Sequence, residues 1–240
     1  MAPSPPTNID TLNALSLSSL CAQFFPYDST TLQYNHNGIS NQLILQLETP
    51  STILPQDMKA CFDLIATTSA ADYMTSSVGW SPANKRKEMR LPDLRYMLLK
   101  RRSLERDEEE GSVVGFLSFM FTYEDGQEVV YCYEVHLAAE SQGKGVGKKL
   151  MQMMEEAGRK ARVKKAMLTS FKANGSAIKF YEKLGYEEDE YSPRPRKLRN
   201  GIVKEPDYVI LSKILLHENE ASDVKDADPT TDRSGKLEAG

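Results

Sequence analysis

Three closely spaced glycines have the residue type and spacing that phosphate binding requires. They lie in the string Gln142-Gly143-Lys144-Gly145-Val146-Gly147-Lys148-Lys149, which follows an apolar segment and leads into helical periodicity. Glycine lets the backbone approach an anion closely, and the N–H groups and dipole of a helix N-terminus favour negative charge. The string therefore predicts a phosphate cradle at the start of a helix.

Two common phosphate motifs do not fit this string. A Walker loop needs Gly-x-x-x-x-Gly-Lys-Ser/Thr, but counting from Gly143 places Lys148 at the second glycine, and Leu150 follows Lys149. The dinucleotide fingerprint needs Gly-x-Gly-x-x-Gly after the first strand of a parallel unit, whereas the spacing here is Gly-x-Gly-x-Gly after a hairpin. A plain glycine-rich turn stays an open alternative.

The elements that must position the loop alternate between strands and helices. Helices are expected from Pro55, from Pro82 after Ser81, from Lys148, and from Asn174 to a Leu184-Gly185 end. Strands are expected at 42–47, 95–100, 113–123, 129–137, 163–171, 186–191 and 208–215, with a charged loop at 101–111 and a turn at 124–127. This order predicts an α/β (α+β) fold on a mixed, mostly antiparallel sheet with helices on both faces.

Composition divides the chain into three parts. Residues 1–22 are rich in Pro, Ser, Thr and Asn and predict a flexible arm with one short helical turn near residues 15–20. Residues 218–240 predict a disordered acidic tail, and 23–217 predict one domain. The net charge of −4 argues against nucleic-acid binding through bulk charge.

The cysteines and the hydropathy pattern indicate the compartment. Cys21, Cys61 and Cys132 are an odd, widely spaced set that predicts reduced thiols. We find neither a secretion signal nor an apolar run near the roughly 18 residues of a membrane helix, and expect a soluble, intracellular protein without membrane contact. His36 and His217 lie in expected loops, so we expect no metal site.

The glycine loop and two later features resemble the GNAT acetyltransferases. The string matches the Gln/Arg-x-x-Gly-x-Gly loop that binds the coenzyme A pyrophosphate, Asn174 opens the next helix, and Phe-Tyr-Glu-Lys-Leu-Gly-Tyr follows at 180–186. The resemblance covers about residues 57–213 and implies a GNAT acyltransferase fold with acetyl-CoA as co-substrate and no metal. The implied coenzyme residues are Val135, His136, Leu137, Gln142, Gly143, Lys144, Gly145, Val146, Gly147, Lys148, Asn174 and Tyr181. Within the 135–137 segment the backbone N–H groups of the first and third residues would bind the coenzyme, and His136 would be packed or solvent-facing.

Three phrases are similar to the NatD type of N-alpha-acetyltransferase within this family. They are Tyr-Cys-Tyr-Glu-Val at 131–135, Met-Leu-Thr-x-Phe-Lys-x-Asn at 167–174, and Asp-Tyr-x-Ile-Leu-Ser at 207–212; Tyr73 and Gly79-Trp80 are similar too. The resemblance implies acetylation of protein N-termini, with histone tails beginning Ser-Gly-Arg-Gly as substrates, by a monomer of nucleus and cytoplasm.

The same resemblance assigns roles in the transfer. Glu134 would be the general base and Tyr133 would orient the amine, while Tyr181 would lie near the coenzyme sulfur. An α-amino group, with an ordinary pKa near ~7.8 against ~10.4 for lysine, requires only a weak base. The implied peptide-site residues are Tyr73, Trp80, Glu124, Tyr133, Thr169 and Tyr208. As alternatives, Glu134 is an ordinary strand residue and Trp80 a core residue.

Two further observations concern the similarity to NatD: the alternation of side chains along the strand, and two positions that differ from the NatD pattern. Alternation places Tyr131 and Tyr133 on one face and Cys132 and Glu134 on the other, unless a bulge intervenes. Thr122 stands where NatD proteins carry Asp, and Val78 where they carry Trp. Acetylation of lysine or small amines, or non-catalytic acyl-CoA binding, stay alternative functions. The basic loop 194–204 could contact nucleosomal DNA, act as a nuclear import signal, or be solvated surface.

Overall fold

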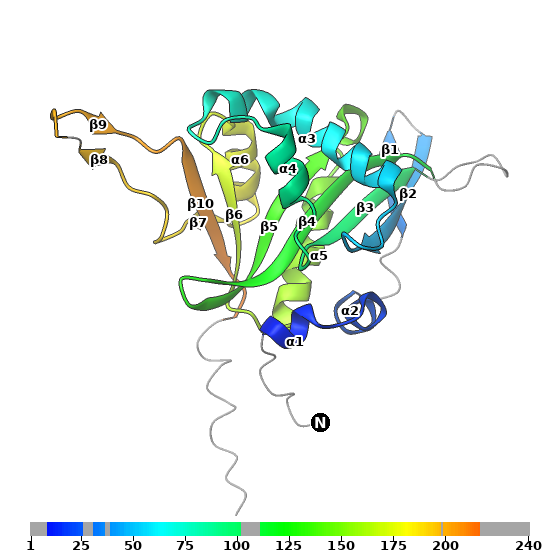
Figure 1. The fold of residues 1–240 in the computed structure, drawn as a ribbon. Coiled ribbons are helices and arrows are strands. Elements are labelled where there is room, and N and C mark those ends of the chain that lie inside the picture. The colour runs from blue at the N-terminus through cyan, green and yellow to red at the C-terminus, as the bar shows by residue number, and fades with distance from the viewer. Residues whose placement is uncertain (1–8, 26–30, 37–38, 102–110, 198, 217–240) are drawn as a thin grey trace, which may run out of the picture.

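An eight-stranded sheet in the order β1-β2-β3-β4-β5-β6-β10-β7 forms the centre of the molecule (Figure 1). The computed structural model describes residues 9–25, 31–36, 39–101, 111–197 and 199–216. Neighbouring strands are antiparallel except for β5 and β6, which are parallel. The strands are β1 (Thr31–His36), β2 (Ile39–Glu48), β3 (Arg95–Arg101), β4 (Val113–Glu124), β5 (Gln127–Leu137), β6 (Lys165–Phe171), β7 (Glu187–Glu188) and β10 (Tyr208–Ile214). The expected fold class is confirmed.

Helices cover both faces of this sheet. On one face lie α3 (Pro55–Thr75) and α4 (Pro82–Glu88); on the other lie α5 (Val146–Lys160) and α6 (Gly175–Lys183). The expected starts at Pro55, Pro82 and Asn174 are confirmed, with the Asn174 side chain accepting from the Ala177 N–H. Helix α5 begins two residues before the expected Lys148, because Gly145 adopts φ 76° and caps it.

The core has one layer on each side of the sheet. Successive residues of β3 alternate between them: Tyr96 and Leu98 face α3, while Met97 and Leu99 face α5. This is the two-residue period of a strand. Because both faces are covered, the central strands are almost entirely buried.

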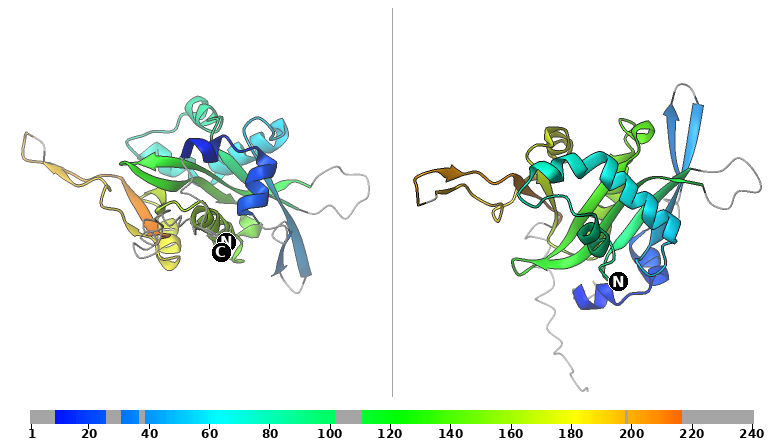
Figure 2. Two further views of the ribbon diagram at one scale, coloured as in Figure 1. Left: turned by 90° about the horizontal axis from the view of Figure 1, so that it is seen from below. Right: turned by 45° about the horizontal axis from the view of Figure 1, so that its top comes forward.

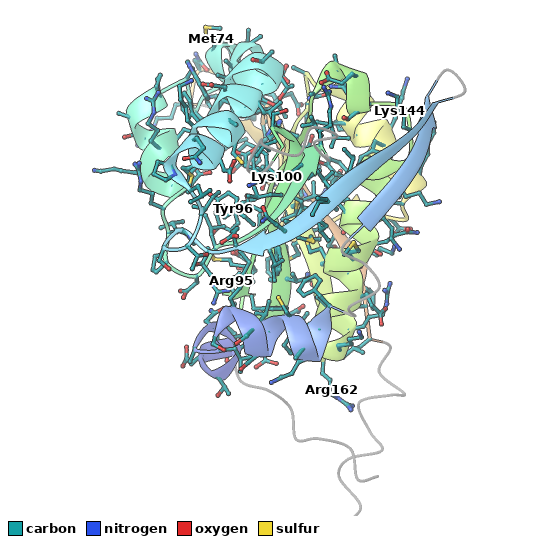
Figure 3. All side chains as sticks on the ribbon, turned by 90° about the vertical axis from the view of Figure 1, so that its right-hand side faces the viewer. Met74, Arg95, Tyr96, Lys100, Lys144 and Arg162 are labelled. Atoms are coloured by element: carbon teal, nitrogen blue, oxygen red, sulfur yellow. The ribbon has the colours of Figure 1, made fainter. Side chains whose placement is uncertain are left out.

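Two helices stand where the sequence predicts a flexible arm with one short helical turn near residues 15–20; the second helix overlaps that turn, and the first was not expected. Helices α1 (Ile9–Asn13) and α2 (Leu17–Phe24) pack Leu12 and Leu20, both fully buried, into the α5-side core. Asn13 donates to the Phe121 carbonyl at 3.0 Å and accepts from Arg95 at 2.9 Å, so Arg95 in Figure 3 lies next to these helices. The polar composition concealed a few apolar residues at helical spacing. Residues 1–8 and the expected tail 218–240 lie outside the described residues.

Three further expectations differ from the structure. Strand β1 was not foreseen, and the expected strand 186–191 shrinks to β7. The expected basic loop is a hairpin of β8 (Arg196–Lys197) and β9 (Val203–Lys204) that projects away from the body (Figures 1 and 2). The expected loop at 101–111 lies mostly outside the described residues. Among the helices that the structure describes, none is long and apolar enough to cross a membrane.

Candidate active site

A cavity of about 810 Å³ opens beyond the last paired residues of β5 and β6. In the described structure the two strands are paired only from Val129–Lys165 to Cys132–Leu168, although β5 continues to Leu137. Beyond that point the edge of β5 borders the cavity, whose other walls come from α3, α6 and the start of α5. A strand edge without a neighbour offers backbone N–H and C=O groups to a ligand. The volume lies within the usual range of small-molecule sites.

The glycine loop forms one end of this cavity. Gly143 (φ 71°) and Gly145 (φ 76°) are left-handed, and an added Cβ would meet nothing within 4 Å at either position. The glycines are therefore required for the backbone conformation, not for space. The Gln142 amide donates to the Leu137 carbonyl at 2.9 Å, which ties the loop to the end of β5. Helix α5 has no acidic residue in its first turn, so its N-terminus suits an anion.

A β-bulge sets the direction of the acidic side chain on β5. Ser118 of β4 lies opposite Glu134 and Phe119 opposite Cys132, so Tyr133 has no opposite residue. Tyr133 and Glu134 consequently both face α3 and α4, while Cys132 packs into the α5-side core. A bulge was the alternative left open to strict alternation, and the structure contains it: the inserted residue places Glu134 on the face opposite to Cys132.

Glu134 is a buried carboxylate with both oxygens engaged. Lys85 of α4 donates to Oε1 at 2.8 Å, and Nε2 of His136 lies 2.6 Å from Oε2. Burial raises the pKa of Glu134, but the contacts with His136 and Lys85 outweigh it and lower the pKa to about 2. Glu134 is therefore anionic at neutral pH.

The Lys85 ammonium is equally buried and uses all three of its N–H donors. Besides Glu134 it donates to the Tyr73 hydroxyl and to Glu88 Oε1, each at 2.7 Å. Burial lowers the pKa of Lys85, but the charge of Glu134 and the neighbouring Tyr73 and Glu88 raise it above its ordinary value. The ammonium therefore stays charged and holds the carboxylate in place.

His136 connects this ion pair to helix α3. Its Nδ1 lies 2.6 Å from the Thr68 hydroxyl, which also donates to the Leu64 carbonyl at 2.8 Å. The imidazole lies beside the Phe116 ring, 5.7 Å between centroids. Both Thr68 and His136 line the cavity.

The family model "Acetyltransferase (GNAT) family" matches residues 70–186, from the last turns of α3 to Tyr186. This match covers a little under half of the chain, and the chain has the fold of the GNAT acetyltransferases. A solved structure of Arabidopsis thaliana NAA60 in complex with a bisubstrate analogue shares the fold, with a TM-score of 0.50, 12% identity, and coverage of 71% of this chain and 97% of that chain.

Two curated proteins are similar in sequence to this chain. N-alpha-acetyltransferase 40 of Saccharomyces cerevisiae is 29% identical over 165 residues, which are 58% of this chain and 55% of the yeast protein's length. The uncharacterized protein YdhI of Bacillus subtilis is 27% identical over 119 residues, 45% of this chain and 70% of YdhI. The match thus spans little more than half of the first relative.

The GNAT cavity brings together most of the residues implied by the resemblance. Those that line it are Tyr73, Tyr133, Glu134, Val135, His136, Leu137, Gln142, Gly143, Gly145, Gly147, Lys148, Thr169, Asn174 and Tyr181. Asn174 also donates to Asp72 Oδ2 at 3.1 Å, and Thr169 lies 2.6 Å from the Tyr131 hydroxyl. Burial raises the pKa of Tyr181, so its hydroxyl stays protonated at neutral pH.

Five implied residues of the GNAT site lie outside the cavity lining. Lys144 donates to the Glu140 carbonyl, and Val146 is buried in the core. Trp80 packs against Phe62 and Tyr73, with ring centroids 6.0 and 5.4 Å away, which agrees with the core alternative. The other two are Glu124 at the hairpin end and Tyr208 opposite Phe171.

The cavity has features that suit coenzyme A, the ligand that the resemblance implies. The left-handed glycines and the start of α5 suit a pyrophosphate, and the uncovered edge of β5 suits an amide-containing chain. Gly147 is also close-packed, since an added Cβ would lie 3.4 Å from Leu137 and 3.6 Å from Phe180. The part of the chain that the structure describes contains no group of three or more His, Cys, Asp or Glu residues suited to a metal.

Sequence reasoning missed Lys85 and Thr68 as site residues. The string Lys85-Arg86-Lys87 indicates a basic surface helix, and nothing in it marks the first lysine as buried. The one available signal was that Lys85 and Glu88, three residues apart, lie on the same side of the helix. Thr68 sits in a run of small polar residues and carried no signal.

Proposed function

We propose that this GNAT domain transfers acetyl from acetyl-CoA to the N-terminal α-amino group of proteins, with histone tails beginning Ser-Gly-Arg-Gly as its substrates. The observation that carries the proposal is a buried, anionic Glu134 beside Tyr133, at the mouth of a cavity that ends in the glycine loop. The similarity to the yeast N-alpha-acetyltransferase supports the substrate class.

On the coenzyme side, the amides of the glycine loop hold the pyrophosphate, and the N–H groups of Val135 and Leu137 hold the pantetheine chain. The coenzyme supplies the acetyl thioester. In the transfer, the amine nitrogen forms a bond to the acetyl carbon, the carbon–sulfur bond breaks, and the amine proton is lost as the coenzyme leaves as a thiol. Tyr181, buried and protonated beside this site, is placed to protonate the sulfur.

On the amine side, Tyr133 orients the terminal nitrogen, and Glu134 supplies the negative charge that favours loss of its proton, directly or through a water. An α-amine, with an ordinary pKa of ~7.8, is neutral at pH 7 several hundred-fold more often than a lysine. Tyr73 and Thr169 line the peptide path, and Trp80 packs against Tyr73. Tyr208 lies opposite Phe171, whose ring contacts Tyr73. Glu124, which raises the pKa of Tyr131 and Tyr133, offers a carboxylate to the arginine of the tail.

The projecting β8–β9 hairpin supports a contact with nucleosomal DNA. Its exposed basic residues are Arg194, Arg196, Lys197, Arg199 and Lys204. Such a cluster attracts phosphate even on an acidic protein. With this substrate, the protein would act as a monomer in nucleus and cytoplasm.

Two peptides with acetyl-CoA test the function by mass spectrometry. One begins with a free Ser-Gly-Arg-Gly terminus; in the other that terminus is blocked and only lysines are free. We expect turnover of the first, loss of turnover in Glu134→Gln, and unchanged coenzyme binding by calorimetry. Acetylation of the blocked peptide alone would make the protein a lysine or amine acetyltransferase, and binding without any turnover would make it an acyl-CoA binding module.

A further inference from the structure

A hydroxyl, an imidazole and a carboxylate form a continuous hydrogen-bonded chain along one wall of the cavity. Thr68 Oγ1 lies 2.6 Å from His136 Nδ1, and His136 Nε2 lies 2.6 Å from Glu134 Oε2. This order of groups activates a hydroxyl in many enzymes, because the carboxylate orients the imidazole and stabilises its protonated form. Thr68 is the most exposed of the three and is the end of the chain that solvent in the cavity can reach.

The proton count of this chain allows two states. The Thr68 hydroxyl has one proton and two acceptors, the Leu64 carbonyl at 2.8 Å and His136 Nδ1. If the hydroxyl donates to Nδ1, the imidazole is neutral and donates from Nε2 to Glu134. If the hydroxyl instead donates to Leu64, then Nδ1 must carry a proton and donate it to the Thr68 oxygen. Nε2 still donates to the anionic Glu134, so both ring nitrogens are protonated and the imidazole is cationic. The two states therefore differ by the direction of the Thr68 hydroxyl and by one proton on His136.

Glu134 alone is poorly suited to hold the proton. Both its oxygens are engaged, and Lys85 has no spare donor to give up. A carboxylate with a pKa of about 2 is also a weak base toward an amine. Imidazole is the side chain whose ordinary pKa lies nearest to neutral pH.

We propose that Thr68 and His136 form the proton-accepting relay of this site, with Glu134 and Lys85 as the groups that position it. The N–H bond of the amine breaks, its proton passes through cavity water to Thr68 Oγ1, and Thr68 passes its own proton to His136 Nδ1. The proton then returns through Thr68 and cavity water to Tyr181, which has given its own proton to the leaving sulfur. No oxidant or further reactant is needed. This inference rests on the proposed acetyl transfer, for which it names the group that stores the proton.

Charged and titratable groups surround the relay on several elements. They are Cys132, Tyr133 and Glu134 on β5, Asp72 and Tyr73 on α3, Lys85 and Glu88 on α4, Tyr96 on β3 and Tyr181 on α6. Burial opposes ionisation of Glu134, but its contacts lower its pKa to about 2. Burial raises the pKa of Cys132 and of the four tyrosines, that of Tyr73 to about 12. Burial lowers the pKa of Lys85, but the charge of Glu134 outweighs it and raises that pKa. At neutral pH, Glu134 and Lys85 therefore stay charged, and Cys132 and the four tyrosines stay neutral.

Three variants test the relay through the pH profile of kcat. His136→Gln keeps both hydrogen bonds but cannot take up a proton, and we expect kcat to fall by about 100-fold, with KM for acetyl-CoA little changed. Thr68→Val should also lower kcat and should change the pH profile of kcat in the same way as His136→Gln. Thr68→Ser should restore both kcat and the profile. Thr67→Val is the matched control, because this neighbouring exposed hydroxyl also donates to a helix carbonyl, that of Asp63, and does not line the cavity.

Nitrogen NMR of the histidine rings provides a readout that needs no substrate. We expect the His136 ring, assigned by its loss in His136→Gln, to change its tautomer in Thr68→Val but not in Thr67→Val. An unchanged tautomer in Thr68→Val, or a His136→Gln enzyme with the wild-type kcat, would overturn the relay. An acetyl adduct on Thr68 would also overturn it and make that residue a nucleophile. If the peptide is not acetylated but the tautomer responds to Thr68→Val as expected, the proposed substrate has failed and the relay stands.

Discussion

Lys85→Met removes the cation from the buried ion pair and should destabilise the fold strongly. The Lys85 and Glu134 side chains are 6% and 10% exposed, and Lys85 Nζ lies 2.8 Å from the carboxylate. Removal of one partner from such a pair typically costs about 3–5 kcal/mol, because the remaining charge is left buried. The pKa gives a second measure: a fall from 4.5 to about 2 corresponds to about 3 kcal/mol. The contacts with His136 and with Lys85 both contribute to this lowered pKa. We therefore expect Lys85→Met to lower the free energy of unfolding by about 3 kcal/mol.

Urea unfolding at pH 7 measures this loss of stability. The same measurement at lower pH tests the direction in which protonation of Glu134 changes the stability. Because the folded pKa of Glu134 is lowered, its contribution is complete above pH 4.5 and disappears as pH falls toward 2. Lys59→Met is the matched control, since its partner Asp63 is 55% exposed and such pairs contribute at most about 1 kcal/mol. Adding Glu134→Gln to Lys85→Met should recover part of the stability. A loss under about 1 kcal/mol, or strict additivity in the double variant, would refute the reasoning.

Three further substitutions test other parts of the structure. Leu12→Ala should lower the free energy of unfolding by about 2–5 kcal/mol in urea titrations, because this side chain of α1 is fully buried; a loss no larger than in Ser18→Ala would contradict the packing. Gly145→Ala places a Cβ in a left-handed conformation at a cost of about 1–2 kcal/mol, so calorimetry should show about tenfold weaker coenzyme binding, and equal affinity would argue against the loop as the cradle. Asn174→Ala removes the cap of α6 and should cost about 1 kcal/mol in thermal unfolding, whereas Asn174→Asp, which retains the cap, should cost less.

The parts of the fold that follow from local chemistry were predictable from the sequence. Proline at the first turn of α3, Ser81 before α4, and the glycines before α5 act through neighbouring backbone atoms, so a short window contains the whole cause. The N-terminal helices were not predictable in this way. Their few apolar residues, such as Leu12, are decisive only because β4 and α5 present a surface to cover.

The residues of the candidate site also fall into those that a local sequence pattern predicts and those that it does not. The glycine loop and Asn174 are sequence signatures, and the structure brings them to one cavity. The burial of Lys85 depends on a carboxylate 49 residues away, which no local pattern encodes. A basic helix on the surface and one that neutralises an active-site acid have the same composition.

The bulge at Tyr133 explains why the buried charges can exist at all. Without the inserted residue, Glu134 would face the α5 side, where Cys132 lies among the apolar side chains of the larger core cluster. A carboxylate there would cost several kcal/mol or be protonated, because no cation of that cluster could pair with it. One extra residue turns Glu134 to the face where Lys85 and His136 supply its hydrogen bonds. The inserted residue is Tyr133 itself, which therefore has no opposite residue on β4 and lies beside the cavity. The irregularity is thus a condition for the site: it places the ionised carboxylate of Glu134 on the face of the sheet where its ion-pair partner Lys85 lies.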